Sequence, residues 1–215
     1  NVSHDLRTPL ATIQGYVETI LIKSDSLTEN EKNNYIHIIH SSAERLKKLI
    51  EELFELSRLE AKEKKPAPEL FSIGELAQDV HQKNLIHADA KNIEFITKFP
   101  LTLPMVYADI GMIEKVLQNL IENAIKFTPE NGKIILSVTY EEDSLIVSIE
   151  DNGYGIRNED LPFVFDRYSK GKIKEEGENT DGLGLGLTIV KKILEVQNIR
   201  LYVKSIEGKG TVFSF

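Results

Sequence analysis

Two short glycine-rich segments stand where the backbone could approach a bound anion. Asp151-Asn152-Gly153-Tyr154-Gly155-Ile156 follows a predicted strand, and its glycines allow a tight turn while its carboxylate can accept a hydrogen bond from an amine. The run from Asp181 to Gly186 opens a predicted helix, whose amino end offers N–H groups and a positive dipole end to a phosphate. Alone, each is more simply a glycine turn or a loop before a helix cap. The second also lacks the spacing of the dinucleotide fingerprint.

A predicted helix over residues 109–127 carries a stripe of polar side chains. Asn119, Glu122, Asn123 and Lys126 recur at steps of three and four, so they share one face, and apolar residues fill the other. Asparagine is a poor helix former and adds little to a bare surface. An amide oxygen is a good ligand for Mg²⁺, and Lys126 lies one turn beyond Asn123, so both could meet the same phosphates. A plain solvated face explains the stripe equally well.

His4 is the candidate nucleophile. Near neutral pH an imidazole is largely unprotonated, so one ring nitrogen can attack phosphorus while a carboxylate orients the other. Asp5 could supply that carboxylate, although adjacent side chains do not face each other on an ideal helix. Pro9 cannot donate a hydrogen bond to the Asp5 carbonyl, so we expect a kink one turn beyond His4. The other histidines are predicted to be solvated or structural; they are His37, His40, His81 and His87.

Composition excludes several classes of function. The 215 residues carry a net charge of −8, 41% are apolar and none is cysteine. There can therefore be no disulfide scaffold, no thiolate nucleophile and no cysteine metal site. The acidic balance predicts no nucleic-acid partner, because phosphate backbones are bound by an excess of Lys and Arg. No apolar run reaches the roughly 18 to 20 residues of a membrane span, and a chain opening inside an amphipathic pattern is expected to be part of a longer protein.

The first part of the chain is predicted to be a helical hairpin. Apolar residues recur with helical period over 2–23 and again over 28–60, where Thr28 to Glu31 has the form of a capping box. Two such helices have narrow apolar faces and cannot enclose a core, so self-association into a dimeric four-helix bundle is expected. A charged and Pro-rich linker over 62–68 then predicts two domains, residues 1–65 and 66–215.

The second part mixes helices and strands. Helices are predicted over 72–90, 109–127 and 185–197, and strands over 93–99, 133–140, 144–151, 200–205 and 211–215. The strands over 133–140 and 144–151 are expected to form a hairpin. This mixture indicates an α+β fold, with helices layered on one face of a sheet.

Together and in this order, the motifs resemble the catalytic core of a sensor histidine kinase over essentially the full length of the chain. Ser3-His4-Asp5-Leu6-Arg7-Thr8-Pro9-Leu10 looks like the H box of that family, and residues 119–128 look like its N box. Residues 151–156 and 181–186 resemble the two glycine boxes. The F box is matched by Phe163-Val164-Phe165-Asp166-Arg167-Tyr168, and a last segment by Gly208-Lys209-Gly210-Thr211-Val212-Phe213.

The resemblance implies a dimerisation and phosphotransfer hairpin followed by an α/β sandwich that binds ATP and Mg²⁺. Asp151 would bind the adenine amine, Asn123 would hold Mg²⁺, and Lys126 with Asn119 would meet the phosphates. Tyr168 to Asp181 would form a lid with Arg167 or Lys170 as the cation for the γ-phosphate. The other residues expected to border the nucleotide are Phe127, Gly153, Gly155, Ile156, Gly182, Leu183, Gly184, Leu185, Gly186 and Thr211.

The activity implied is ATP-dependent phosphorylation of His4 and transfer of the phosphoryl group to an aspartate in the receiver domain of a response regulator. Asn119 stands where gyrase and chaperone relatives place a glutamate that activates water, and an amide is no base, so hydrolysis should be slow. Glu122 is spaced wrongly for that role. A cytoplasmic location is expected, with any membrane anchor in segments outside these residues.

Two other functions stay open. One is a nucleotide-gated dimeric scaffold without phosphotransfer, and the other is a chaperone-like ATPase. Two local departures from the family pattern are also present. Residues 197–200 replace a more typical glycine-rich turn, and Ser169-Lys170 stands where a tyrosine-arginine pair is usual.

The resemblance also yields a testable division of labour within the first motif. An acidic residue after the histidine and a Thr three positions beyond that acid are linked to phosphatase activity in similar kinases. Thr8→Ala is therefore expected to impair dephosphorylation of the partner regulator more than autophosphorylation of His4. Both rates can be followed with labelled phosphate, and an equal loss of the two would refute the assignment.

Overall fold

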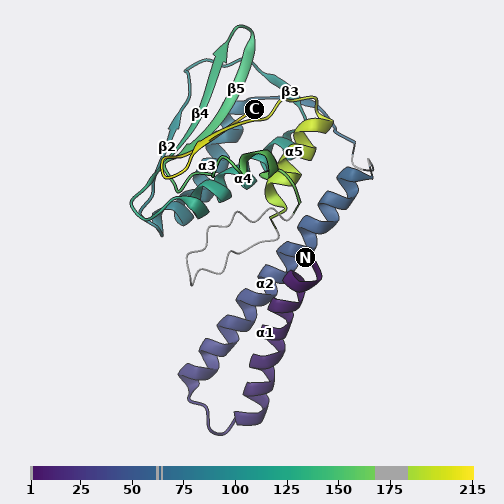
Figure 1. Ribbon diagram of the computed structural model, residues 1–215, viewed down its shortest axis with the longest axis vertical. Helices are drawn as coiled ribbons and strands as arrows, with labels where there is room; N and C mark the ends of the chain where they lie inside the picture. The colour runs from purple at the N-terminus through teal and green to yellow at the C-terminus, as the bar shows by residue number, and fades with distance from the viewer. Residues whose placement is uncertain (1, 62, 64, 168–183) are drawn as a thin grey trace.

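The computed structural model describes residues 2–61, 63, 65–167 and 184–215, which form a helical stalk and a wider α/β unit (Figure 1). The stalk consists of α1 (Val2–Lys23) and α2 (Glu29–Glu60). The predicted capping box begins α2: the Thr28 hydroxyl accepts from the Glu31 N–H at 3.3 Å, and the Glu31 carboxylate accepts from the Thr28 N–H at 2.8 Å. The helical hairpin is thus confirmed. Helix α1 continues through Pro9, and the predicted kink there stays a prediction.

The main sheet of the α/β unit has five strands in the order β2-β4-β5-β7-β6. Their bounds are β2 Glu94–Lys98, β4 Lys133–Glu141, β5 Ser144–Asp151, β6 Tyr202–Ile206 and β7 Gly210–Ser214. Strands β4 and β5 form the predicted hairpin, turned by Glu142 and Asp143, which both adopt positive φ. Strand β2 runs parallel to β4, because a long crossover that includes α4 returns the chain to the starting end.

Three helices lie on one face of this sheet: α3 (Ile73–Asp89), α4 (Ile110–Phe127) and α5 (Gly186–Val196) (Figure 1). The core between helices and sheet is apolar and closed to solvent. Its largest fully buried side chains from the sheet are Ile134, Leu136 and Ile149, and those from α4 and α5 include Leu117, Leu120, Ile121, Ile189 and Ile193. The α+β architecture is therefore confirmed, with α4 in the middle of the helical layer.

Three short elements were missed by the sequence prediction. Strands β1 (Glu69–Phe71) and β3 (Val106–Ala108) pair with each other in a separate antiparallel sheet, and η1 (Leu161–Phe163) is a single 3₁₀ turn. Three residues are too few to show a hydrophobic period, and β1 directly follows the Pro-rich linker. These strands exist because each finds the other, which local sequence cannot show.

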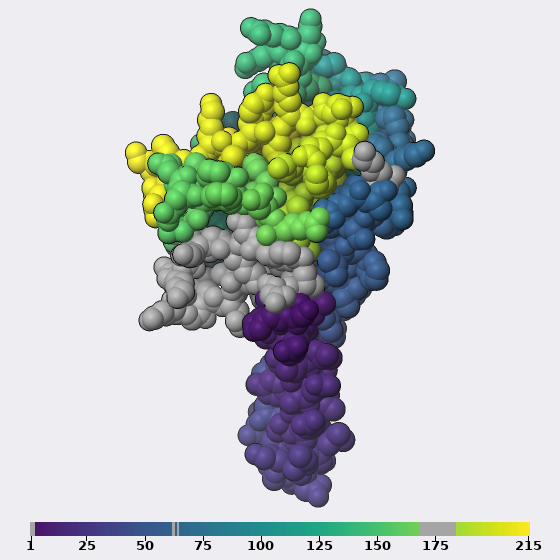
Figure 2. All heavy atoms as spheres, turned by 45° about the vertical axis from the view of Figure 1, so that its right-hand side comes forward, coloured from purple at the N-terminus to yellow at the C-terminus, as the bar shows by residue number. Residues whose placement is uncertain are grey.

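The α/β unit rests against the upper half of α2, which runs beyond the start of α1 and passes beside α5 (Figure 1). Leu49, Leu56 and Leu59 are almost fully buried and follow the helical period along one side of α2. Figure 2 shows the stalk as a narrow column below the wider unit. Among the helices in the described residues, none has the length and apolar character needed to cross a lipid bilayer.

Asp109 joins the linker, α4 and the end of α5. Its Oδ1 accepts from the Met112 N–H at 2.9 Å and so caps the amino end of α4. Its Oδ2 accepts from the Ala67 N–H of the linker at 2.9 Å. The Asp109 N–H itself donates to Gln197 Oε1, just beyond α5, at 2.7 Å. One residue thereby fixes where the chain enters the α/β unit relative to two of its helices.

Substitution of Asp109 separates the two roles of its carboxylate. Asp109→Ala loses both the cap and the linker contact and should lower the free energy of unfolding by about 1–2 kcal/mol. Asp109→Asn keeps an oxygen for the cap but puts an amide donor against the Ala67 N–H, so it should cost less. Urea denaturation of both variants measures this, and equal losses would show that the cap contributes nothing.

Candidate functional site

Helix α4 presents the predicted polar stripe, but not as a uniformly solvated face. Glu122, Asn123 and Lys126 are partly exposed, as expected. Asn119 is only 6% exposed, and its Nδ2 donates to the Lys115 carbonyl at 3.0 Å. A Cβ on Gly186 would lie 3.3 Å from Asn119 Oδ1, so glycine lets the first turn of α5 close on this side chain. The expectation that a plain solvated face could explain Asn119 was therefore wrong, because α5 covers it.

The carboxyl end of α4 meets the first glycine-rich segment. The Phe127 carbonyl accepts from the Tyr154 N–H at 3.2 Å. A Cβ on Gly153 would come within 2.3 Å of the same carbonyl oxygen, so only glycine permits this approach. The Lys126 ammonium lies 5.1 Å from the centre of the Phe127 ring. Residues 126–127 and 153–154 are thus brought together from separate elements.

Asp151 ends β5 with a buried carboxylate. The residue is 8% exposed, and its Oδ1 accepts from the Gly153 N–H at 2.9 Å and from the Thr211 N–H at 3.2 Å. Burial raises the pKa of Asp151 above the usual range of an aspartate, although the two backbone N–H groups act in the opposite direction. Both of these hydrogen bonds are accepted by Oδ1. They fix the plane of the carboxylate group and so the direction in which Oδ2 points.

Ser205 was missed by the sequence prediction, yet its hydroxyl joins the first glycine-rich segment to β7. Its hydroxyl donates to the Gly210 carbonyl at 2.9 Å, accepts from the Ile156 N–H at 2.8 Å, and lies 2.9 Å from Thr211 Oγ1. A hydroxyl has one hydrogen to donate, so the Thr211 hydroxyl donates to Ser205. A serine inside a predicted strand has no distinguishing pattern, which explains why it was overlooked.

The second glycine-rich segment is only partly within the described residues. Gly184 has a φ of +68°, and Leu185 is fully buried immediately before α5. Lys170, Gly182, Leu183 and the predicted lid of residues 168–181 lie in the range 168–183, outside the described residues. Arg167, the other candidate cation, forms an ion pair with Glu60 of α2.

His4 lies in the first turn of α1 with its side chain 76% exposed. Its Nδ1 is 3.6 Å from Asp5 Oδ1, so these adjacent residues do approach each other. The Thr8 hydroxyl donates to the His4 carbonyl at 3.1 Å, which links the third predicted residue of this motif to the backbone of the first. A carboxylate beside Nδ1 leaves Nε2 as the ring nitrogen turned away from Asp5.

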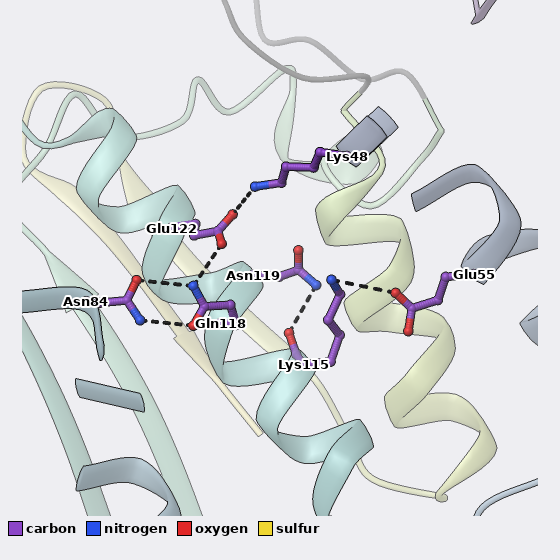
Figure 3. A network of polar contacts seen from close by, with 7 residues as sticks. All are labelled: Lys48, Glu55, Asn84, Lys115, Gln118, Asn119 and Glu122. Atoms are coloured by element: carbon purple, nitrogen blue, oxygen red, sulfur yellow. Dashed lines mark hydrogen bonds and ion pairs between the residues drawn. The ribbon is translucent and has the colours of Figure 1, made fainter. Parts of the chain in front are cut away.

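A polar network joins α4 to α2 and α3 (Figure 3). Lys48 donates to Glu122 Oε2 at 2.5 Å, and Gln118 donates to Glu122 Oε1 at 2.8 Å. Gln118 also exchanges hydrogen bonds with Asn84 of α3, while Lys115 pairs with Glu55 of α2 at 3.7 Å. Burial alone would raise the pKa of Glu122, but the hydrogen bonds from Lys48 and Gln118 and the nearby lysine charges bring it below its usual range. Glu122 is therefore a firmly bound acceptor at the stalk, which argues against its use as a base.

Comparisons with known proteins agree with this geometry. Residues 108–215 match the family model of the histidine kinase-, DNA gyrase B-, and HSP90-like ATPases. Residues 1–62 match the model of the His Kinase A (phospho-acceptor) domain. A phosphoacceptor hairpin followed by this ATPase fold defines the class of protein. The chain belongs to the histidine kinase family, and it contains the catalytic core of a sensor histidine kinase.

The similarity to individual relatives extends over essentially the whole length of this chain. Sensor histidine kinase WalK of Bacillus subtilis (strain 168) is 32% identical over 219 residues, covering 100% of this chain and 35% of WalK. The structure of full-length ShkA in complex with AMPPNP has a TM-score of 0.75 and 27% identity, covering 99% of this chain and 43% of that one. The structure of ThkA in complex with the response regulator protein TrrA has a TM-score of 0.76 and 28% identity, covering 100% and 58%. The chain thus spans about a third of the length of WalK.

The environment of Asp151 predicts that stability and binding respond oppositely to its removal. Its pKa is higher in the folded state than in the unfolded chain, so the ionised carboxylate opposes folding at neutral pH. This penalty is relieved as pH falls through the folded-state pKa. Asp151→Asn keeps an acceptor for Gly153 and Thr211, so its melting temperature at pH 7 should be unchanged or higher. Its affinity for an adenine nucleotide should nevertheless fall by roughly tenfold or more, because a charge-assisted hydrogen bond is lost.

Thermal melts and calorimetric titration with AMPPNP measure both effects, with Asp143→Asn, in the turn that precedes β5, as the matched control. Undiminished nucleotide affinity in Asp151→Asn, with the control behaving as wild type, would contradict the role given to this carboxylate.

Proposed function

We propose that this chain is an ATP-dependent protein-histidine kinase that phosphorylates His4 and passes the phosphoryl group to an aspartate of a response regulator. The observation that carries the proposal is the convergence on the carboxyl end of α4 of the glycine turn after β5 and the fixed carboxylate of Asp151. The phosphoacceptor motif stands on the stalk to which the same helix is bonded.

The nucleotide is proposed to lie between α4, β5 and the start of α5. Asp151 Oδ2 accepts the exocyclic adenine amine, because Oδ1 is already engaged by Gly153 and Thr211. Lys126 and Asn119 meet the phosphates, and the backbone at Gly184 and Gly186 borders them at the amino end of α5, where the helix dipole favours anions. The binding of AMPPNP by the similar protein ShkA supports ATP as the substrate. Arg167 and Lys170 remain proposed cations for the γ-phosphate.

Mg²⁺ is proposed to bind at Asn123. The fit rests on donor chemistry: Asn123 offers an amide oxygen, lies partly exposed on α4, and is one turn from Lys126. Mg²⁺ typically takes one or two protein oxygens and completes its shell with water and substrate phosphates. When bound, the ion would neutralise part of the charge of the triphosphate, while Lys126 and Asn119 orient the phosphates.

The chemistry at His4 follows from the position of Asp5. The Nε2 lone pair attacks the γ-phosphorus of ATP and forms an N–P bond. The bond from that phosphorus to the bridging oxygen breaks, and ADP leaves with the electron pair of that bond. The ring gains positive charge, and the Asp5 carboxylate 3.6 Å from Nδ1 stabilises it or takes the Nδ1 proton. In the second step the N–P bond breaks as an aspartate oxygen of the regulator binds the phosphorus.

The partners are proposed on the same basis. A receiver domain is the proposed acceptor, supported by the complex of the similar kinase ThkA with the response regulator TrrA. A homodimer through residues 1–65 is supported by large apolar side chains that a single hairpin leaves exposed, including Leu10, Val17, Leu21, Ile22 and Ile36. The division into domains 1–65 and 66–215, a cytoplasmic location and a membrane anchor elsewhere in the protein are part of the proposal.

The decisive test is incubation with Mg²⁺ and ATP labelled at the γ-phosphate. The chain should acquire label that is stable in base and lost in acid, as phosphohistidine is. His4→Ala should retain nucleotide binding but lose essentially all label, because no second nitrogen occupies the same position. His40→Ala, which removes an exposed histidine from α2, is the matched control and should label normally.

The same experiment separates the alternatives. Nucleotide binding with no label on the wild-type chain would favour the dimeric scaffold. Rapid release of inorganic phosphate with no labelled protein would favour the chaperone-like ATPase. Label that persists in His4→Ala would refute His4 as the phosphoacceptor.

A further inference from the structure

The terminal backbone carbonyl groups at the carboxyl end of α4 all have hydrogen-bond donors. The last four carbonyl groups of an α-helix have no partner within the helix and must find one elsewhere. Here the Ala124 carbonyl accepts from the Thr128 N–H at 3.0 Å, and the Phe127 carbonyl accepts from the Tyr154 N–H at 3.2 Å. The two carbonyls between them need a donor from outside both the helix and the glycine turn.

Lys91 supplies that donor. Its ammonium donates to the Ile125 carbonyl at 3.0 Å, to the Lys126 carbonyl at 3.1 Å and to the Thr128 carbonyl at 3.3 Å. An ammonium has three hydrogens, so these three contacts use its full donor capacity. All four terminal carbonyls of α4 are thereby paired, two of them by a side chain 34 or 35 residues earlier in the chain.

The position of Lys91 is itself fixed. It lies in the turn between α3 and β2, is partly buried, and its carbonyl accepts from the Asn131 N–H at 3.2 Å. The next residue, Asn92, adopts a φ of +52° and lets the chain reverse towards β2. The lysine is therefore clamped at its backbone and at its tip, and its charge lies at the negative end of the α4 dipole.

We infer that Lys91 is a positioning residue of the nucleotide site, and this inference rests on the proposed function. It holds the last turn of α4, and so places Lys126 for the phosphates and Asn123, one turn earlier, for the metal. It does not touch Asp151 or Thr211, which belong to β5 and β7 and would hold the adenine. Its removal should therefore weaken phosphate and metal recognition while sparing adenine recognition.

A purely structural lysine would behave differently. If Lys91 contributed only to folding, its loss would lower stability, and any effect on binding would fall equally on every ligand of the site. The distinction between the two ends of the nucleotide is thus the readout that separates positioning from stability. Substitution by methionine keeps most of the side-chain volume and removes all three donors.

The experiment compares the full chain with Lys91→Met at a temperature at which both are folded. Affinity is measured for Mg²⁺ with AMPPNP by calorimetry and for adenosine by chemical-shift titration. Lys91→Met should bind Mg²⁺–AMPPNP about tenfold more weakly and adenosine within twofold of the wild type. Lys91→Arg retains several donors and should recover part of the lost affinity.

Lys83→Met is the matched control. Lys83 lies on α3 and, like Lys91, contacts α4: it donates to Glu114 at 2.7 Å, but near the amino end of α4. Its loss should leave both affinities unchanged. Equal weakening of both ligands in Lys91→Met, or unchanged affinity for Mg²⁺–AMPPNP, would overturn the inference. Failure of the unsubstituted chain to bind AMPPNP would instead refute the proposed function.

Discussion

The site depends on one helix being held at both ends while its middle is buried. The apolar side of α4 is closed into the core by the sheet and by α5, which prevents the helix from rotating. Asp109 caps its amino end and ties it to the linker, and Lys91 with the Tyr154 N–H satisfies its carboxyl end. Because backbone polar groups are costly to leave unpaired, these bonds give the helix a defined axial position. The fixed position of the helix in turn places the polar residues of its last turns.

The same helix links the proposed nucleotide site to the stalk. Lys48 and Glu55 of α2 meet Glu122 and Lys115 of α4, on the turns that also carry Asn119 and Asn123. Two carboxylates at this interface have pKa values shifted in opposite directions. Burial raises the pKa of Glu52 despite the nearby lysines, whereas hydrogen bonds and lysine charges bring that of Glu122 below its usual range. An ionised Glu122 thus favours the contact at neutral pH, and that contribution is lost as pH falls through its folded-state pKa.

The elements with a clear hydrophobic period could be predicted from the sequence. The two stalk helices, α3, α4, α5 and the hairpin of β4 and β5 all lie within a few residues of their expected bounds, because each buries one face and obeys the period of its geometry. Strands β1 and β3 could not be predicted, since three-residue strands form only by tertiary pairing. The parallel pairing of β2 with β4 likewise depends on a crossover that local patterns do not record.

The site divides in the same way. His4, Asp5 and Asp151 stand in local motifs, so the neighbouring residues in the sequence were enough to predict them as site residues. The burial of Asn119 under α5, the hydroxyl of Ser205 and the ammonium of Lys91 depend on contacts between segments distant in sequence. A lysine in a surface turn has no distinguishing sequence pattern. Only the three-dimensional structure places the Lys91 ammonium at the terminal carbonyls of α4.

We propose that the carboxyl end of α4 and the carboxylate of Asp151 together bind one ATP molecule. The most direct measurement is an experimental structure of the chain with Mg²⁺ and AMPPNP. We expect the adenine amine within hydrogen-bonding distance of Asp151 and the triphosphate along the last turns of α4, beside Asn123 and Lys126. An adenine ring bound elsewhere, or phosphates directed away from α4, would contradict it.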